Sequence, residues 1–162
     1  MVVRSNRVLS ASLDLGYLGL FLGLRVNELV VDRLIAAGFR RVRMSHGFVI
    51  QHLIEADRSI TELASRMEVS QQAASKVVAE LVRLGLLEVS AGEDRRAKRI
   101  RLSRRGWKAV RLGRQTRRRI ERRLTKAVGA RAYATARSLI VNCLEALGGL
   151  DHIGARRVGS AR

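Results

Sequence analysis

The fold of this chain is decided by the stretch SITELASRMEVSQQAASKVVAE, residues 59–80, which carries the signals of two short helices. Ser59 and Glu62 stand three residues apart, the spacing of a capping box, in which each side chain satisfies a backbone amide at a helix start. Only the residues EVS separate this helix from the next one, which Ser70 can cap. The stretch therefore predicts two helices that meet at a tight turn.

The second of these helices has one apolar and one small polar face. Its predicted buried stripe consists of Ala74, Val77, Val78, Leu81 and Leu84. A helix of this kind fits the major groove of DNA, where Gln, Ser and Lys side chains reach base edges or phosphates. The candidate DNA-binding residues here are Ser70, Gln71, Gln72, Ser75 and Lys76. The competing interpretation is an ordinary solvated helix face.

Two short segments with alternating apolar and charged residues follow, at residues 86–89 and 99–103. They predict a β-hairpin, because side chains of a strand point alternately to opposite faces. Ile100 and Leu102 then face the helices, whereas Arg99 and Arg101 point to solvent or to a partner. The predicted fold class is mainly α with a small β-hairpin wing, a winged helix-turn-helix.

The turn of this hairpin is strongly basic and holds the candidate wing contacts. Arg96, or its neighbour Arg95, is expected to enter a minor groove, where narrow A·T tracts concentrate negative potential. Asp94 can hold that guanidinium by charge-assisted hydrogen bonds and fix its direction. Lys98 completes the set of candidate wing residues. The alternative is a solvated charged turn.

The flanks of this region are also predicted to be helical, and the chain has no proline to interrupt them. A first apolar helix is expected over residues 13–37 and a short one from after Ser45 to near Asp57. A basic helix and a last helix with a Leu, Ile and Cys143 stripe follow the hairpin. Trp107 and Phe21 are assigned to the core. The predicted domains are 1–45, an N-terminal dimerisation helix; 46–106, the DNA-binding lobe; 107–148, linker and C-terminal dimerisation helices; and 149–162, a flexible basic tail.

Composition points to a polyanionic partner. Among 162 residues, 32 are Lys or Arg and 14 are Asp or Glu, which gives a formal net charge of +18. Such a chain repels itself unless an anion lies nearby, so nucleic acid is the expected partner and a membrane is not. The single cysteine suits a reducing cytoplasm. No histidine spacing fits a metal, and no nucleophile, glycine loop or carboxylate pair predicts an enzyme or a cofactor.

Residues 59–106 resemble the DNA-binding core of the MarR family of bacterial transcription regulators. The matching positions are Leu63 and Ala64 before the turn, Ser70 to Lys76 in the recognition helix, Leu81 and residues 85–88 at the start of the wing, Asp94 and Arg96 in a D-x-R element, and Leu102, Ser103 and Gly106 at an L-T-x-x-G end. Three positions depart from the pattern. Lys76 stands where arginine is commoner, Ser103 replaces threonine, and Ala91-Gly92 replaces Asp-Pro.

The resemblance implies a homodimer whose first and last helices intertwine and which regulates transcription, usually as a repressor, from a pseudo-palindromic operator. It also implies a small anionic or phenolic effector between the dimer and DNA lobes. The alternative function is an architectural protein that coats DNA with little sequence specificity, which the charge and the Arg-rich helix would support.

Overall fold

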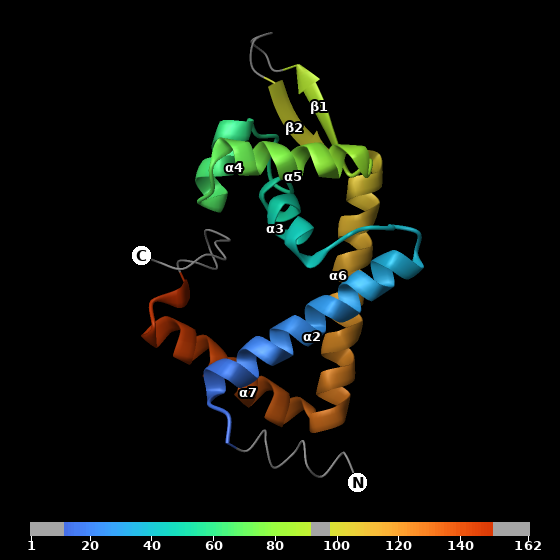
Figure 1. The fold of residues 1–162 in the computed structure, drawn as a ribbon. Coiled ribbons are helices and arrows are strands. Elements are labelled where there is room, and N and C mark those ends of the chain that lie inside the picture. The colour runs from blue at the N-terminus through green and yellow to red at the C-terminus, as the bar shows by residue number, and fades with distance from the viewer. Residues whose placement is uncertain (1–11, 92–97, 151–162) are drawn as a thin grey trace.

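The computed structural model describes residues 12–91 and 98–150, which form six α-helices and one β-hairpin (Figure 1). The elements are α2 (Leu15–Ala36), α3 (Met44–His52), α4 (Ile60–Met67), α5 (Gln71–Arg83), β1 (Leu87–Ala91), β2 (Lys98–Leu102), α6 (Arg104–Val128) and α7 (Ala130–Ala146). The mainly α fold with a small wing is therefore confirmed.

Both helices of the helix-turn-helix begin at the predicted capping residues. The Ser59 hydroxyl accepts a hydrogen bond from the Glu62 amide at 3.2 Å, and the Glu62 carboxylate accepts one from the Ser59 amide at 2.6 Å. Glu68 ends α4 in the left-handed conformation, with φ 55°. The Ser70 hydroxyl then caps α5 by accepting from the Ala73 amide at 3.1 Å.

The wing is a two-stranded antiparallel sheet that a third piece of backbone extends. Its register pairs Leu87 with Leu102 and Val89 with Ile100. Arg58, just before α4, forms an isolated bridge with Ile100 through two backbone hydrogen bonds of 3.0 and 2.8 Å. The wing is therefore joined by backbone to the segment that leads into the helix-turn-helix.

This bridge explains why one predicted element was too long. The helix expected to run to near Asp57 ends at His52, because Arg58 must lie extended to pair with Ile100. The strands are also displaced by one or two residues from the predicted segments. Leu86 is held by the end of α5, where its amide donates to the Leu81 carbonyl at 2.9 Å, so β1 begins at Leu87.

The core lies where α3, α4, α5, the wing and the start of α6 meet. Its largest fully buried side chains are Leu63, Leu81, Leu86, Ile100, His46 and Val49. The predicted inward orientation of Ile100 and Leu102 is confirmed, and Trp107 packs half-buried against this core. Figure 1 shows this lobe at one end of α6, with α2 crossing α6 and α7 at the other end.

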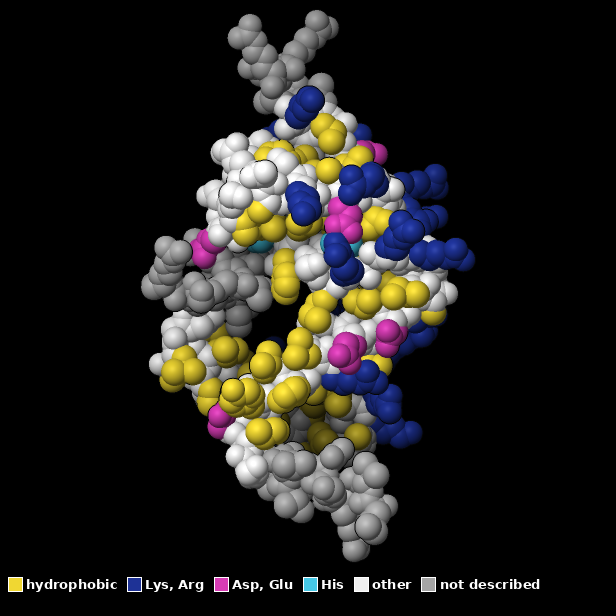
Figure 2. Space-filling view, viewed as in Figure 1, with side chains coloured by type: hydrophobic (Ala, Val, Ile, Leu, Met, Phe, Trp, Pro, Cys, Tyr) yellow, Lys and Arg dark blue, Asp and Glu magenta, His cyan; other side chains and the backbone are white. Residues whose placement is uncertain are grey.

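The arm formed by α2 and α7 leaves much of its apolar surface uncovered in the single chain. Within α2 only Leu34 is buried. Phe21, which was assigned to the core, is 55% exposed, so that assignment is wrong for the single chain. Figure 2 shows apolar side chains gathered along α2. The exposed apolar residues of the arm are Leu15, Tyr17, Leu18, Leu20, Phe21, Leu22, Ile35, Leu139, Ile140 and Leu147.

α6 meets the lobe at a close backbone junction. A Cβ placed on Gly106 would lie 2.1 Å from the Leu86 carbonyl oxygen. The hydroxyl of Ser103 accepts from the Gly106 amide at 2.9 Å and donates to the Gly85 carbonyl at 2.6 Å, and the Ser103 amide donates to the Leu86 carbonyl at 3.0 Å. Ser103 thus performs the capping role in place of the threonine that is usual in the resembling family.

We expect Gly106→Ala to destabilise the chain by about 1–3 kcal/mol or more, because the added methyl group must displace backbone. Urea unfolding measures the change. Gly113→Ala in the same helix is the matched control, since its Cβ would lie at an ordinary 3.7 Å from Val30 and alanine favours a helix. Equal stability of Gly106→Ala and the parent chain would contradict the close junction.

Candidate nucleic-acid interface

The exposed face of α5 carries the predicted recognition residues. Gln71, Gln72, Ser75 and Lys76 are all exposed, while Ala74, Val78 and Leu81 are buried on the opposite side of the helix. Within the part of the chain that the structure describes, no hydrogen bond or ion pair engages these four polar side chains. They are therefore available to an external partner.

Ser70 differs from the other four candidates. It is exposed, but its hydroxyl oxygen already accepts the Ala73 amide as the N-cap of α5. A hydroxyl can donate one hydrogen bond while it accepts others, so Ser70 can still donate to a phosphate oxygen. Its first task is to start the helix.

Polar contacts near the C-terminal end of α5 fix it to the start of α3. Glu80 on α5 accepts a hydrogen bond from the Arg43 guanidinium, and its carboxylate lies 3.5 Å from His46 Nε2. His46 is only 1% exposed. Neither residue was singled out for this role from sequence, because His46 and Glu80 are far apart in the chain and no motif links them.

The geometry fixes the tautomer of His46. The Arg43 amide, which can only donate, lies 3.2 Å from His46 Nδ1, so that nitrogen is unprotonated and the proton of the neutral ring is on Nε2, facing Glu80. Burial lowers the pKa of His46 below its usual 6.5 and outweighs the opposing effect of Glu80. Protonation of Nδ1 would also remove the acceptor that caps α3.

The wing strands are fixed by two ion pairs across the lobe. Arg99 on β2 donates to Glu62 at 2.6 Å, and Arg101 donates to Glu88 on β1 at 2.8 Å. Hydrogen bonds with the backbone amide and the hydroxyl of Ser59 lower the pKa of the Glu62 carboxyl group. The positive charge of Arg99 lowers this pKa further. Arg99 and Arg101 are thus engaged within the chain. The capping spacing predicts the Glu62 cap but gives no signal for its partner Arg99.

The candidate wing residues fall mostly at the tip. Asp94, Arg95 and Arg96 lie outside the described residues. Lys98 is exposed at the first position of β2, opposite Ala91 in the register. The described base of the wing, formed by β1 and β2, lies on the same lobe as α5 (Figure 1).

The described residues contain no candidate metal site and no candidate membrane span. No group of three or more His, Cys, Asp or Glu side chains there could hold a metal ion. No helix in residues 12–91 and 98–150 is both long and apolar enough to cross a membrane. Cys143 is half-buried on α7.

Two short helices joined by a tight turn and followed by a two-stranded wing define a winged helix-turn-helix protein. Residues 44–97 match the model of the MarR family. The matched range contains α3, α4, α5 and β1. The winged lobe of this chain therefore matches the MarR family over these residues, which confirms the resemblance seen in the sequence.

Solved structures extend the likeness of fold beyond that lobe. MarR from E. coli is 20% identical, with a TM-score of 0.63, over 82% of this chain and 97% of that one. YusO from Bacillus subtilis is 19% identical, with a TM-score of 0.66, over 87% and 97%. A complex of S. aureus MepR with DNA is 17% identical, with a TM-score of 0.65, over 82% and 98%. No curated protein matches this chain.

Lowering the pH from 7 to 5 is expected to destabilise the lobe through His46. Because its folded-state pKa is lowered, the unfolded chain binds a proton first, so the stability is complete above about pH 6.5 and is lost as the pH falls through the folded-state pKa. Thermal unfolding across this range measures the loss.

The matched variant is His46→Gln, whose unfolding at pH 7 gives the cost of the altered packing. This variant should show a smaller decrease in melting temperature between pH 7 and pH 5 than the parent chain. The same decrease in both proteins would show that other groups control the acid sensitivity.

Proposed function

We propose that this chain is a sequence-specific DNA-binding transcriptional regulator that acts as a homodimer on a pseudo-palindromic operator. The observation that carries the proposal is the exposed polar face of α5, whose side chains no described residue engages, on a lobe of the MarR family. The MepR complex with DNA supports the same use of this fold.

Each part of the lobe has a distinct role in this proposal. α5 enters the major groove, where Gln71 and Gln72 suit adenine and Ser75 suits a base or a phosphate. Lys76 supplies charge without the two-pronged geometry of arginine, so it contacts a phosphate more readily than it selects a base. The basic wing tip, with Asp94, Arg95 and Arg96, and Lys98 at its base contact the neighbouring backbone or minor groove.

The homodimer is supported by the uncovered apolar surface of α2 and α7. This surface lies on helices rather than in the winged core, and such patches commonly mark interfaces. A two-fold dimer would set two α5 helices about one turn of DNA apart, as a pseudo-palindromic operator requires. The proposed domains are the N-terminal dimerisation helix and its lead-in at residues 1–45, the DNA-binding lobe at residues 46–106, and the linker and C-terminal dimerisation helices at residues 107–148.

Further properties follow from the family resemblance. The protein acts in the bacterial cytoplasm as a repressor, without an enzymatic activity. A small anionic or phenolic effector that binds between the arm and the lobe changes the separation of the two α5 helices and releases the operator.

Replacing Phe21 in the exposed apolar face should shift the dimer toward monomer, because a buried charge without a partner is costly. We expect Phe21→Glu to lower the average mass in sedimentation by about half. Val89→Glu is the matched control, since Val89 is 50% exposed on the wing and away from the arm. A dimer that Phe21→Glu leaves intact would contradict the assigned interface.

Selection of bound sequences from a random DNA pool tests the proposed function against the architectural alternative. A regulator enriches one palindromic site at physiological salt in excess random DNA, whereas a coating protein shows a steep salt dependence and no preferred site. A pool without an enriched site would reject the proposal.

The same selection also tests which residues of α5 read the bases. Gln72→Ala or Ser75→Ala should change the preferred base at one position in each half-site, with a cost of about 1–3 kcal/mol at that position. Arg83→Ala, an exposed change at the far end of α5, is the control and should leave the preference intact. Uniform weakening on all sequences would instead make Gln72 and Ser75 positioning contacts.

A further inference from the structure

α6 carries a continuous basic stripe along its solvent face. Its members recur at three- or four-residue steps, which places them on one side of a helix with 3.6 residues per turn. All of them are exposed. The basic stripe consists of Arg104, Lys108, Arg111, Arg118, Arg122 and Lys126, with Gln115 at the one uncharged step.

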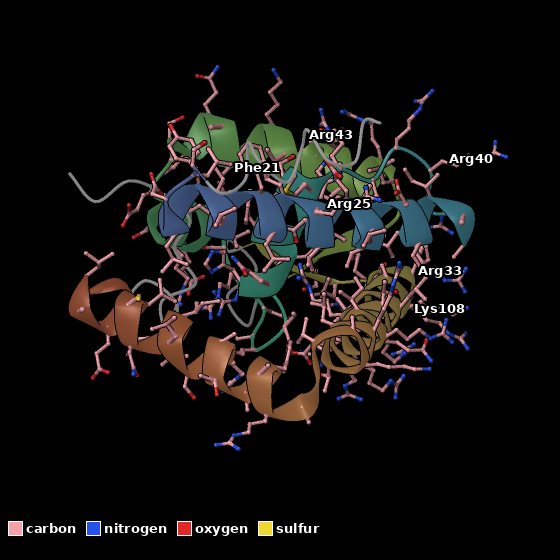
Figure 3. The ribbon with its side chains drawn as sticks, turned by 90° about the horizontal axis from the view of Figure 1, so that it is seen from below. Phe21, Arg25, Arg33, Arg40, Arg43 and Lys108 are labelled. Carbon is pink, nitrogen blue, oxygen red and sulfur yellow. The ribbon has the colours of Figure 1, made fainter. Side chains whose placement is uncertain are left out.

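The opposite side of α6 faces the rest of the protein. Gly106, Ala109 and Val110 are buried against the lobe. Farther along, Gly113 lies against Val30 of α2, since a Cβ there would be 3.7 Å from that side chain. Figure 3 shows Lys108 directed away from α2, and Figure 2 shows Lys and Arg side chains gathered along the same edge of the molecule.

The charges of the stripe have no counter-charge in the described part of the chain. None of its six basic side chains forms an ion pair there, whereas Arg99 and Arg101 on the wing each contact a carboxylate. α6 contains eleven basic residues and a single acid, Glu121, which accepts a hydrogen bond from Tyr133. Like charges three or four positions apart destabilise a helix. An anionic partner would therefore relieve the repulsion between the charges of the stripe.

The first turn of α6 also favours an anionic partner. Its first turn has Arg104 and no acid, although the positive end of the helix dipole favours negative charge there. Arg105 of the same turn is engaged internally, because it donates to the Gly38 carbonyl and lies over the Phe39 ring. Arg104 is left to face the partner.

The stripe fits a polyanion better than a lipid surface. A helix that binds a membrane surface buries an apolar face beside its cationic one. Among the large hydrophobic residues of α6, only Val128, beyond the stripe, is exposed. At one side the basic surface continues into a shallow groove of about 250 Å³ lined by Leu29, Arg33, Thr116, Arg119, Ile120 and Arg123.

The stripe is too long, and lies too far from α5, for one DNA duplex to contact both α5 and the whole stripe. Arg104 to Lys126 spans about 33 Å along the helix, close to one turn of duplex DNA. α6 begins at the base of the wing and runs away from α5 toward α7 (Figure 1). A duplex seated on α5 and the wing reaches only the beginning of the stripe, which leaves Arg111, Arg118 and Arg122 uncovered.

We propose that the basic stripe of α6 binds a second segment of double-stranded DNA through its phosphates, without sequence preference. A duplex that lies along α6 presents both of its phosphate backbones to the stripe within one turn. The inference goes beyond the proposed regulator, because it makes each protomer a bridge between an operator on α5 and other DNA on α6.

A two-duplex capture assay tests this inference with the full chain. One random-sequence duplex is immobilised and loaded with protein, and retention of a second, labelled random-sequence duplex is measured. Arg111→Gln, Arg118→Gln and Arg122→Gln together should reduce retention by roughly tenfold at physiological salt and make the salt slope shallower by about 2 to 3. The same three residues changed to lysine should keep the retention, because phosphate contact needs only the charge.

The matched control removes three positive charges elsewhere, by Arg25→Gln, Arg40→Gln and Arg131→Gln, all exposed and outside α6. It should retain the second duplex within about twofold of the parent chain. Equal losses in the two triple variants would overturn the inference, because net charge alone would then explain capture. Tighter binding of phosphatidylserine vesicles or double-stranded RNA than of DNA by the parent chain, lost in the α6 variant, would also overturn it.

The test separates this inference from the proposed function. If the random pool yields no preferred site but capture depends on α6, the inference about the stripe is supported and the proposed regulator is rejected. If a preferred site depends on Gln72 and Ser75 while the α6 variant captures the second duplex normally, the regulator stands and the stripe fails.

Discussion

The approach of Gly106 to the Leu86 carbonyl is the constraint on which the rest of the structure depends. Leu86 is the point where α5 ends and the wing begins, and its backbone is held by Leu81 on one side and by Ser103 on the other. Because no side chain fits between Leu86 and α6, the directions of α5, the wing and α6 are all fixed at this one junction.

The lobe is then made rigid by links between segments that are distant in sequence. Arg58 pairs with Ile100 through the backbone, Arg99 with Glu62, and Glu80 with the Arg43 and His46 pair. Each link joins the helix-turn-helix to a neighbour rather than to itself. The polar face of α5 is consequently held in position while its own side chains are left for a partner, which is the arrangement that base recognition requires.

Local signals made the helix-turn-helix and the wing predictable, and nonlocal contacts account for what was missed. Ser59, Glu62 and Ser70 act within one helical turn, so their spacing alone reveals their role. The early end of α3 depends on a backbone bridge to a strand more than forty residues later, which no local pattern contains. The exposure of Phe21 has a similar origin, since an apolar stripe predicts burial but does not say whether the same chain supplies the cover.

The unbroken course of α6 has a mechanical consequence. One helix of 25 residues, about 37 Å long, joins the base of the wing to α7, without a proline or a described break before Gly129. It behaves as a stiff lever, so a tilt of about 5° at the arm displaces the lobe end by roughly 3 Å. A displacement of that size is comparable to the rise of one base pair. In the proposed dimer, a small change in how the two arms pack would therefore be enough to move a whole lobe out of register with DNA.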